Sequence, residues 1–320
     1  MMSRSCFLSA LFLVFCLSPV AEVIEGQTAA DAGAAAQPVS KTEQWREGLA
    51  AWRAQREQQI AAPGGPLTLV GMEWLKPGFN KVGSGADNEI RLRAEVPEHI
   101  GMLTVSGKVV QLLAPAGGFP AELEIDGEPA REGPLTVVGK PSTIAWHGLT
   151  MTVVSRGGRF ALLAKDANAA KRTEFKGLKW YAPDPHLRVI AEWVPFKPAH
   201  IEQIPTAAGP ALGLTAPGFA EFVLDDKAYT LEPVMEDPAG KTLFFILRDE
   251  TSTTTTYETG RYLHTGLPDK GLDEAGYLTL DFNELENPPC AYTTYATCPL
   301  APEQNRLGVA LEAGEERYSH

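Results

Sequence analysis

The sequence predicts a mainly β protein, in which antiparallel sheets form a sandwich or barrel-like fold after a single N-terminal helix. From residue 66 onward, short apolar segments alternate with Gly, Pro, Asn and Asp, which is typical of antiparallel strands and turns. Only the stretch before residue 63 repeats its apolar residues at helical spacing. Asp126-Gly127 is the clearest hairpin signal, because both residues tolerate the positive φ of a type I′ turn.

The predicted helix covers residues 40–62. Ser40 and Glu43 form a capping-box pair, in which the Ser hydroxyl accepts from the backbone N–H at Glu43. The apolar residues that share one face are Trp45, Leu49 and Trp52. Charged residues, Arg56 among them, are expected on the opposite side. The Pro63–Pro66 cluster follows and cannot continue the helix.

The β-rich part divides into two predicted halves, residues 63–177 and 178–320. Two runs of strand-like segments are separated by a Pro-containing connection at Trp180–Pro185, so a boundary is expected near Gly177. One continuous domain is the alternative at this length.

The first 39 residues read as a leader and a tether. Arg4 precedes an apolar stretch from Phe7 to Val20, which predicts a signal peptide over residues 1–21, with Ala21 as one possible cleavage position. About 14 helical residues span about 21 Å, less than a bilayer core of about 30 Å. An uncleaved anchor is the alternative. Residues 22–39 predict a flexible tether, so we expect an exported protein, periplasmic or secreted, without a stable membrane span after signal removal.

Charge and motif content narrow the function classes. The formal net charge of −12 would repel phosphate backbones, so no nucleic-acid partner is expected. We find no phosphate loop, dinucleotide fingerprint or Gly-x-Ser-x-Gly elbow, and no two histidines stand at metal-ligand spacing. The sequence therefore predicts neither a cofactor nor a metal.

Two cysteines remain after removal of Cys6 and Cys16 with the signal peptide. In an oxidising compartment, Cys290 and Cys298 predict a disulfide, which would stabilise the fold by about 2–3 kcal/mol. The alternative is a free Cys290 thiol that acts as a nucleophile beside a base such as His264.

Several sequence blocks resemble one known family. The blocks of the C-terminal third are Thr256–Leu263, Asp281–Asn283, Asn287–Tyr292, Ala296–Leu300, Asn305–Leu307 and Ala313–Glu315. Together with Gly71–Leu92, they resemble the bacterial family named only as domain of unknown function 1684, over about residues 45–318. The resemblance implies no established reaction. Residues 83–92 also faintly resemble the start of a forkhead-associated domain, a β-sandwich that binds phosphothreonine, although Ser84 stands where that domain presents an arginine.

The segment from Asp281 to Arg306, with Arg261 before it and Glu315 behind it, is the predicted functional region. It concentrates polar side chains among prolines that stiffen the backbone, as a preorganised recognition site requires. The predicted ligand-binding residues are Arg261, Asp281, Asn283, Asn287, Tyr292 and Glu315. Arg261 is expected to pair with Asp281 or Glu315. The alternative is that these groups satisfy one another in turns.

The sequence supports three functional hypotheses. The first is an exported binding protein for a small polar ligand, either a carbohydrate or a carboxylate. The second is a hydrolase in which Asp281 and Glu315 act as an acid and base pair. The third is a structural envelope protein without a ligand. Whether the protein is an enzyme stays open.

Overall fold

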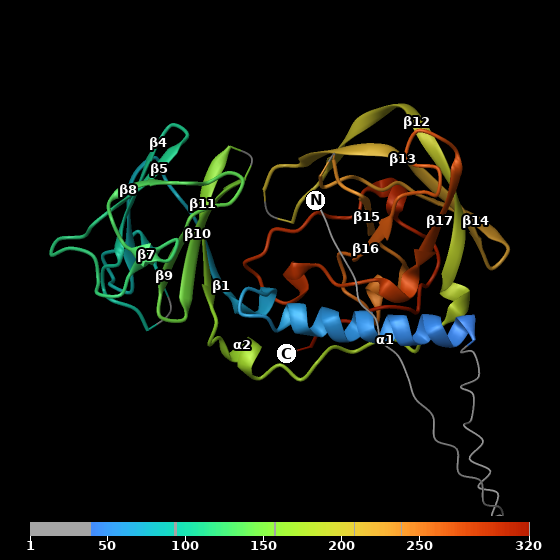
Figure 1. Ribbon diagram of the computed structural model, residues 1–320, viewed down its shortest axis with the longest axis horizontal. Coiled ribbons are helices and arrows are strands. Elements are labelled where there is room, and N and C mark those ends of the chain that lie inside the picture. Colours follow the sequence, from blue (N-terminus) through green and yellow to red (C-terminus); the bar gives the residue numbers. More distant parts are fainter. Residues whose placement is uncertain (1–39, 93–94, 157, 208, 238, 320) are drawn as a thin grey trace, which may run out of the picture. The chain divides into compact units, whose positions relative to one another are not determined.

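The computed structural model describes residues 40–319, apart from 93–94, 157, 208 and 238 (Figure 1). The predicted signal peptide and tether lie outside the described residues. Residues 40–320 form one compact unit, so the boundary near Gly177 stays a prediction. Within the part of the chain that the structure describes, no helix is long and apolar enough to cross a bilayer.

Helix α1 (Lys41–Ile60) confirms the predicted N-terminal helix. Ser40 is its N-cap, and Ser40 Oγ accepts a hydrogen bond from Glu43 N at 3.2 Å. The helix buries Leu49 and Ile60 against the rest of the chain (Figure 1). A second, one-turn helix α2 (Ala170–Thr173) follows the first β-rich half.

The expectation that Arg56 lies on the solvent side of α1 is wrong. Its guanidinium forms ion pairs with Glu286 at 3.2 Å and with Glu315 at 2.9 Å, and only 13% of its side chain is exposed. The helix therefore contributes a charged residue, as well as its apolar face, to the interior of the second half.

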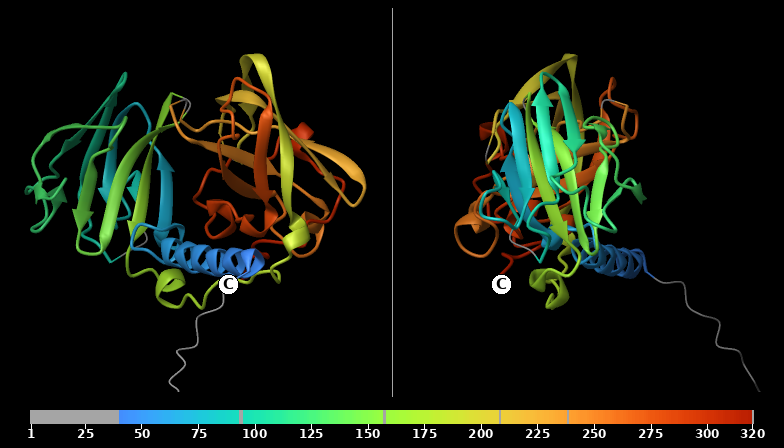
Figure 2. Two further views of the ribbon diagram at one scale, coloured as in Figure 1. Left: turned by 45° about the vertical axis from the view of Figure 1, so that its right-hand side comes forward. Right: turned by 90° about the vertical axis from the view of Figure 1, so that its left-hand side faces the viewer.

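The first half is a sandwich of two open sheets (Figure 2). Their strands are β1 (Leu69–Trp74), β2 (Gly78–Gly83), β3 (Ile90–Arg91), β4 (Gly101–Ser106), β5 (Val109–Leu113), β6 (Glu124–Ile125), β7 (Glu128–Pro129), β8 (Gly133–Leu135), β9 (Thr143–Trp146), β10 (Leu149–Arg156) and β11 (Arg159–Asp166). One sheet has the order β1-β11-β10-β9-β6-β7 and the other β3-β2-β4-β5-β8, and only β2 and β3 pair in parallel. Both sheets supply one shared apolar core, which makes them a sandwich.

The predicted hairpin turn at Asp126-Gly127 joins β6 to β7. Both residues have positive φ, 54° and 87°, as a type I′ turn requires. The likeness of this half to a forkhead-associated domain stays a prediction.

The second half combines a four-stranded and a two-stranded antiparallel sheet, both open. Its strands are β12 (Arg188–Ile204), β13 (Leu212–Leu224), β14 (Lys227–Leu231), β15 (Thr242–Leu247), β16 (Arg261–Gly266) and β17 (Gly276–Asp281). The larger sheet has the order β14-β13-β12-β17, and β15 pairs with β16. A core separate from that of the first half lies between them. The fold class is therefore confirmed as mainly antiparallel β with one long N-terminal helix.

Strand β12 changes the face that it buries along its length. Ala191 and Trp193 are buried before an irregularity, and Ile204 is buried after it. From Pro195 to His200, β12 advances by five residues while its partner β13 advances by two, so β12 contains three extra residues here. Because side chains of a strand alternate between its two faces, an odd number of extra residues reverses the faces. After the irregularity, the even-numbered residues of β12 therefore point inward.

After β17 the chain forms a tail of 3-10 turns and isolated bridges. Its 3-10 turns are Phe282–Glu284, Pro289–Ala291 and Glu303–Asn305. Earlier in the described residues, 3-10 turns occur at Pro66–Thr68, Pro185–Leu187 and Glu250–Thr253. Single bridges join the tail to earlier residues at Trp180↔Glu315, Arg248↔Arg306 and Tyr262↔Glu286. The tail thus packs on the second half with few regular strand hydrogen bonds.

Candidate functional site

Five of the six predicted ligand-binding residues are sealed inside the second half. The exposed fraction is at most 1% for Arg261, Asn283, Asn287, Tyr292 and Glu315. We call these five residues the tail cluster. Most of their polar atoms bond to other atoms of the chain, whereas Arg261 Nε and Asn287 Oδ1 are buried without a hydrogen-bond partner among the described residues. This arrangement favours the structural interpretation, while the predicted role of these residues in binding is untested.

Glu315 lies at the centre of the tail cluster. Its carboxylate accepts hydrogen bonds from Arg56 Nε at 2.9 Å, Asn287 N at 2.8 Å and Tyr292 Oη at 2.6 Å. Burial opposes the charge of Arg56, but the carboxylates of Glu315 and Glu286 outweigh it and raise the pKa of Arg56. Glu315 is thus paired on both oxygens and cannot reach a ligand in this conformation.

Arg261 pairs with Asp249, whereas we expected Asp281 or Glu315. The distance from Arg261 Nη2 to Asp249 Oδ2 is 3.0 Å, and neither side chain is exposed. The same guanidinium donates to the carbonyls of Leu311, at 2.8 Å, and Ala313. Arg261 therefore fastens the end of the tail to the start of β16.

The two asparagines of the tail cluster bond to backbone groups. Asn283 Oδ1 accepts from Asp184 N and its Nδ2 donates to Asp184 O, both at 2.8 Å. Asn287 Nδ2 donates to Glu316 O at 2.7 Å. Such amides replace strand hydrogen bonds where the backbone is irregular.

The predicted disulfide is wrong for this structure, because Cys290 and Cys298 are both free. Cys290 N donates to Cys298 Sγ at 3.0 Å, and a hydrogen bond between the side chains lowers the pKa of the Cys290 thiol. The two sulfurs therefore meet as a hydrogen-bonded thiol pair. His264, proposed as a base for Cys290, instead lies 3.4 Å from Glu236 and 3.6 Å from Glu286.

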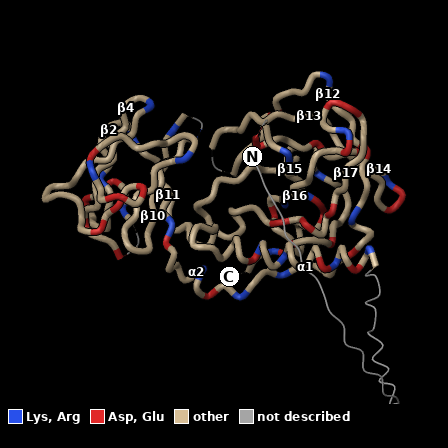
Figure 3. Tube along the Cα trace, in the orientation of Figure 1, with Lys and Arg blue, Asp and Glu red and all other residues tan. Residues whose placement is uncertain are grey.

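Asp281, one of the predicted ligand-binding residues, lines a hollow. A pocket of about 330 Å³ lies between α1 and the ends of β12, β16 and β17. Its lining includes Trp45, Gly48, Leu49, Arg188, Leu263, His264, Thr265, Gly266, Thr279, Asp281 and Glu284. We call it the α1 pocket. Charges of both signs are interspersed along α1 and the neighbouring segments (Figure 3).

Asp281 organises one wall of the α1 pocket. Asp281 Oδ2 accepts from Trp45 Nε1 at 2.6 Å and pairs with Arg188 Nε at 3.3 Å. Its Oδ1 accepts from Asn283 N and Nδ2. Four donors occupy the acceptor sites that a carboxylate offers, so Asp281 acts as an anchor for Arg188, whose side chain is 45% exposed.

Glu284 is the titratable group of the α1 pocket that the sequence did not reveal. Burial first, and the negative charge of Asp281 second, raise the pKa of Glu284 to about 7, against the opposing effect of Arg188. Its only sequence signal is its position three residues after Asp281 in a block already rich in acids. The α1 pocket therefore holds one carboxyl that is partly protonated near neutral pH.

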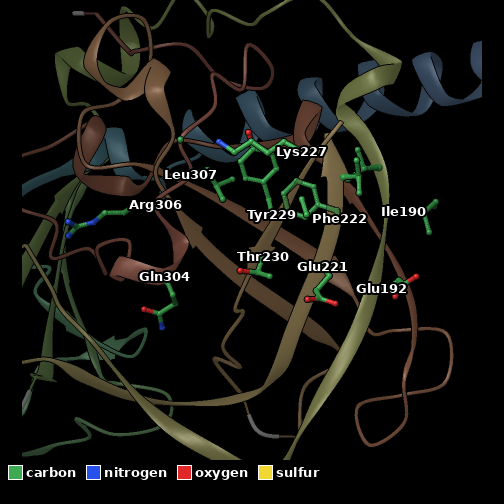
Figure 4. A pocket seen from close by; sticks show the side chains of 14 residues that line it. Ile190, Glu192, Glu221, Phe222, Lys227, Tyr229, Thr230, Gln304, Arg306 and Leu307 are labelled. Atoms are coloured by element: carbon green, nitrogen blue, oxygen red, sulfur yellow. The ribbon is translucent and has the colours of Figure 1, made fainter. Parts of the chain in front are cut away.

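A larger hollow lies elsewhere, on the β12–β14 sheet (Figure 4). It has a volume of about 910 Å³, and Glu192, Glu221 and Thr230 lie side by side across its three strands. Its edge carries exposed apolar residues such as Ile190. We favour the smaller α1 pocket as the functional site because buried charges and a shifted carboxyl converge there.

Comparison with known proteins identifies a family. The model of a family described as a protein of unknown function (DUF1684) matches residues 173–316. An uncharacterized protein of Haloarcula marismortui, solved by solution NMR, is 32% identical over 46% of this chain and 79% of its own, with a TM-score of 0.39. No curated protein matches the chain. The chain belongs to the DUF1684 family, whose description assigns no function.

Proposed function

We propose that the protein binds a small polar ligand in the α1 pocket, and that the ligand is a carbohydrate. The observation that carries the proposal is that an anchored, half-exposed Arg188 and the partly protonated Glu284 line the same hollow. A volume of about 330 Å³ suits a small ligand. A few fixed polar groups in such a hollow give orientation and specificity.

A carbohydrate suits these groups better than a carboxylate does. Sugar hydroxyls both donate and accept hydrogen bonds, so they can bond to Glu284 and Arg188 together. A ligand carboxylate would meet the negative charges of Asp281 and, above its pKa, Glu284. Trp45 and Leu49 add apolar surface from α1.

Thermal melting with a panel of compounds tests the proposal. The panel contains glucose, galactose, N-acetylglucosamine and their common disaccharides, with succinate and citrate for the carboxylate alternative. A ligand that binds the native state raises the melting temperature in a concentration-dependent way. We expect a shift with at least one sugar, lost in Arg188→Ala and retained in Glu221→Gln, which removes a charge from the β12–β14 sheet instead. No change in melting temperature with any sugar, or an equal change in Arg188→Ala, would contradict the proposal. The hypothesis of a structural protein without a ligand would then be favoured.

A glycoside hydrolase is the second candidate, favoured by one observation. Inverting and retaining glycosidases need a carboxylic acid that stays protonated near its working pH, and the raised pKa of Glu284 supplies one. The pair first considered, Asp281 and Glu315, is less suited because partners occupy both carboxylates. Release of nitrophenol from nitrophenyl glycosides, abolished in Glu284→Gln, would support catalysis. Binding without turnover would leave the first proposal in place.

We also propose that the protein is exported. The apolar stretch from Phe7 to Val20 after Arg4 supports export through a cleaved signal peptide. Mass spectrometry of the N-terminus in separated cell fractions tests this. A chain that keeps Met1 and stays in the cytoplasm would contradict it.

A further inference from the structure

Three side chains that can bind a metal ion lie close together on the β12–β14 sheet, those of His200, Glu202 and Glu232. Each offers one atom, and these three atoms lie within 4.8 Å of one another. His200 Nε2 is 3.1 Å from Glu232 Oε1 and 3.5 Å from Glu202 Oε2. No residue of the α1 pocket belongs to this set.

Hydrogen bonding within the set leaves one oxygen unsatisfied. A single Nε2–H points at one acceptor, yet carboxylate oxygens flank it on two sides. Glu232 Oε1 is buried, and its contact with His200 Nε2 at 3.1 Å does not have the alignment of a hydrogen bond. A buried carboxylate oxygen with a poorly aligned donor is incompletely compensated, so a bound cation would stabilise it further.

The separations fit coordination of one small cation. Zinc lies about 2.0–2.2 Å from histidine nitrogen and carboxylate oxygen, which places tetrahedral ligands about 3.3–3.5 Å apart. The separations of His200 Nε2 from the two carboxylates, 3.1 and 3.5 Å, lie near that edge length, and all three ligand atoms lie within 4.8 Å of one another. Imidazole as a ligand favours zinc and similar first-row ions over Ca²⁺ and Mg²⁺.

The fold holds these ligands in place from both sides. The irregularity in β12 turns His200 and Glu202 toward the inner side of the sheet, two residues apart on one face. Phe196 packs against the His200 ring at a centroid distance of 4.7 Å. Asn305 clamps the backbone of Glu232, accepting from its N and donating to its O, both at 2.8 Å. Gln304 adds a hydrogen bond to the Glu232 carboxylate.

We propose that the protein binds one divalent first-row ion, with Zn²⁺ as the representative, through His200 Nε2 and the carboxylates of Glu202 and Glu232. Three protein ligands leave a further coordination position, as in zinc sites that accept water or a substrate. The side chains of His200 and Glu202 are 44% and 26% exposed, so an ion can enter from solvent. The same arrangement gives the Asn305–Leu307 block a role, because Asn305 positions a ligand from behind.

Titration calorimetry of the tag-free, chelator-treated full chain with ZnCl₂ tests the proposal. We expect one ion per chain, and at least about 100-fold weaker binding in His200→Ala and in Glu232→Gln. Gln304→Ala, which removes only the outer hydrogen bond, is expected to weaken binding about tenfold. Melting curves verify that each variant is folded, which the exposure of His200 favours.

Two controls separate this site from other zinc binders. His147→Ala removes an exposed histidine that lies 3.5 Å from one glutamate only, and it should bind zinc like the wild type. The double variant Cys290→Ser/Cys298→Ser should also bind normally, and the Co²⁺-loaded protein should show no sulfur-to-metal charge-transfer band. Loss of binding in the cysteine variant, undiminished binding in His200→Ala, or no binding at micromolar zinc would each overturn the proposal.

Discussion

Replacing Asp249 by Asn should expose the energetic role of Arg261. The substitution keeps the shape of the side chain but removes the charge that lies 3.0 Å from Arg261 Nη2, where neither side chain is exposed. Breaking one partner of a buried ion pair typically costs 3–5 kcal/mol, because the other charge is left uncompensated. The carbonyls of Leu311 and Ala313 still accept from the guanidinium, so the lower part of that range is the better expectation.

Urea denaturation followed by tryptophan fluorescence and circular dichroism measures this loss. A cost of about 3 kcal/mol corresponds to a lowering of the melting temperature on the order of 10 °C for a chain of this size. The matched control is Asp87→Asn, which breaks an exposed pair with Lys81 at 3.5 Å. That change should cost no more than about 1 kcal/mol. If both variants lose the same small amount, Arg261 does not fasten the tail, and its predicted role as a ligand clamp regains weight.

Three further predictions follow from single groups. Glu284 is protonated in the folded protein at pH values where the unfolded chain, with its ordinary pKa of 4.5, has released the proton. The contribution of Glu284 to stability should therefore fall as pH rises from about 4.5 to about 7. In Glu284→Gln this pH dependence should disappear. Urea titrations at pH 8 should show that the variant is more stable than the wild type by about 1–2 kcal/mol, after allowance for solvent screening. The pKa of Cys290 is lowered by its hydrogen bond with Cys298, so iodoacetamide should alkylate Cys290 faster than Cys298. In Cys298→Ala, the alkylation of Cys290 at neutral pH should be slower. Peptide mass spectrometry measures both rates, and equal rates would contradict the thiol pair. Gly48→Ala should stabilise the protein by about 0.5–1 kcal/mol in the same urea assay, because Gly48 lies within α1 and a Cβ there meets open space. A loss of stability would show that the wall of the α1 pocket is more tightly packed than it is in this structure.

The architecture followed from local chemistry that the sequence displays directly. Ser40 and Glu43 predicted the start of α1, and Asp126-Gly127 predicted a hairpin turn, because caps and tight turns depend on neighbouring residues alone. The open or closed state of the sheets did not follow, since strand order depends on pairings between distant segments.

The candidate sites were harder to predict because they depend on long-range contacts. Arg56 looked like a solvent-facing helix residue, yet it pairs with Glu315, more than 250 positions later in the chain. His200 and Glu202 did carry a usable signal, a His-x-Glu pair on one strand face. A prediction from pairs of histidines does not detect this pair, and Glu232 joins it through the fold alone.

The many polar side chains of the tail are explained by the hydrogen bonds that its own backbone needs, without a role in function. The tail has almost no strand partners, so its backbone donors and acceptors must find side-chain partners when they are buried. Asn283, Asn287 and Arg261 meet that need, which accounts for conspicuous polar blocks without a ligand. Groups available to a ligand or an ion are instead those that the backbone does not use, such as the half-exposed ends of Arg188 and His200. In a tail of this kind, a dense polar motif therefore predicts how the chain is fastened, and function is better sought where a charged side chain keeps one face unpaired.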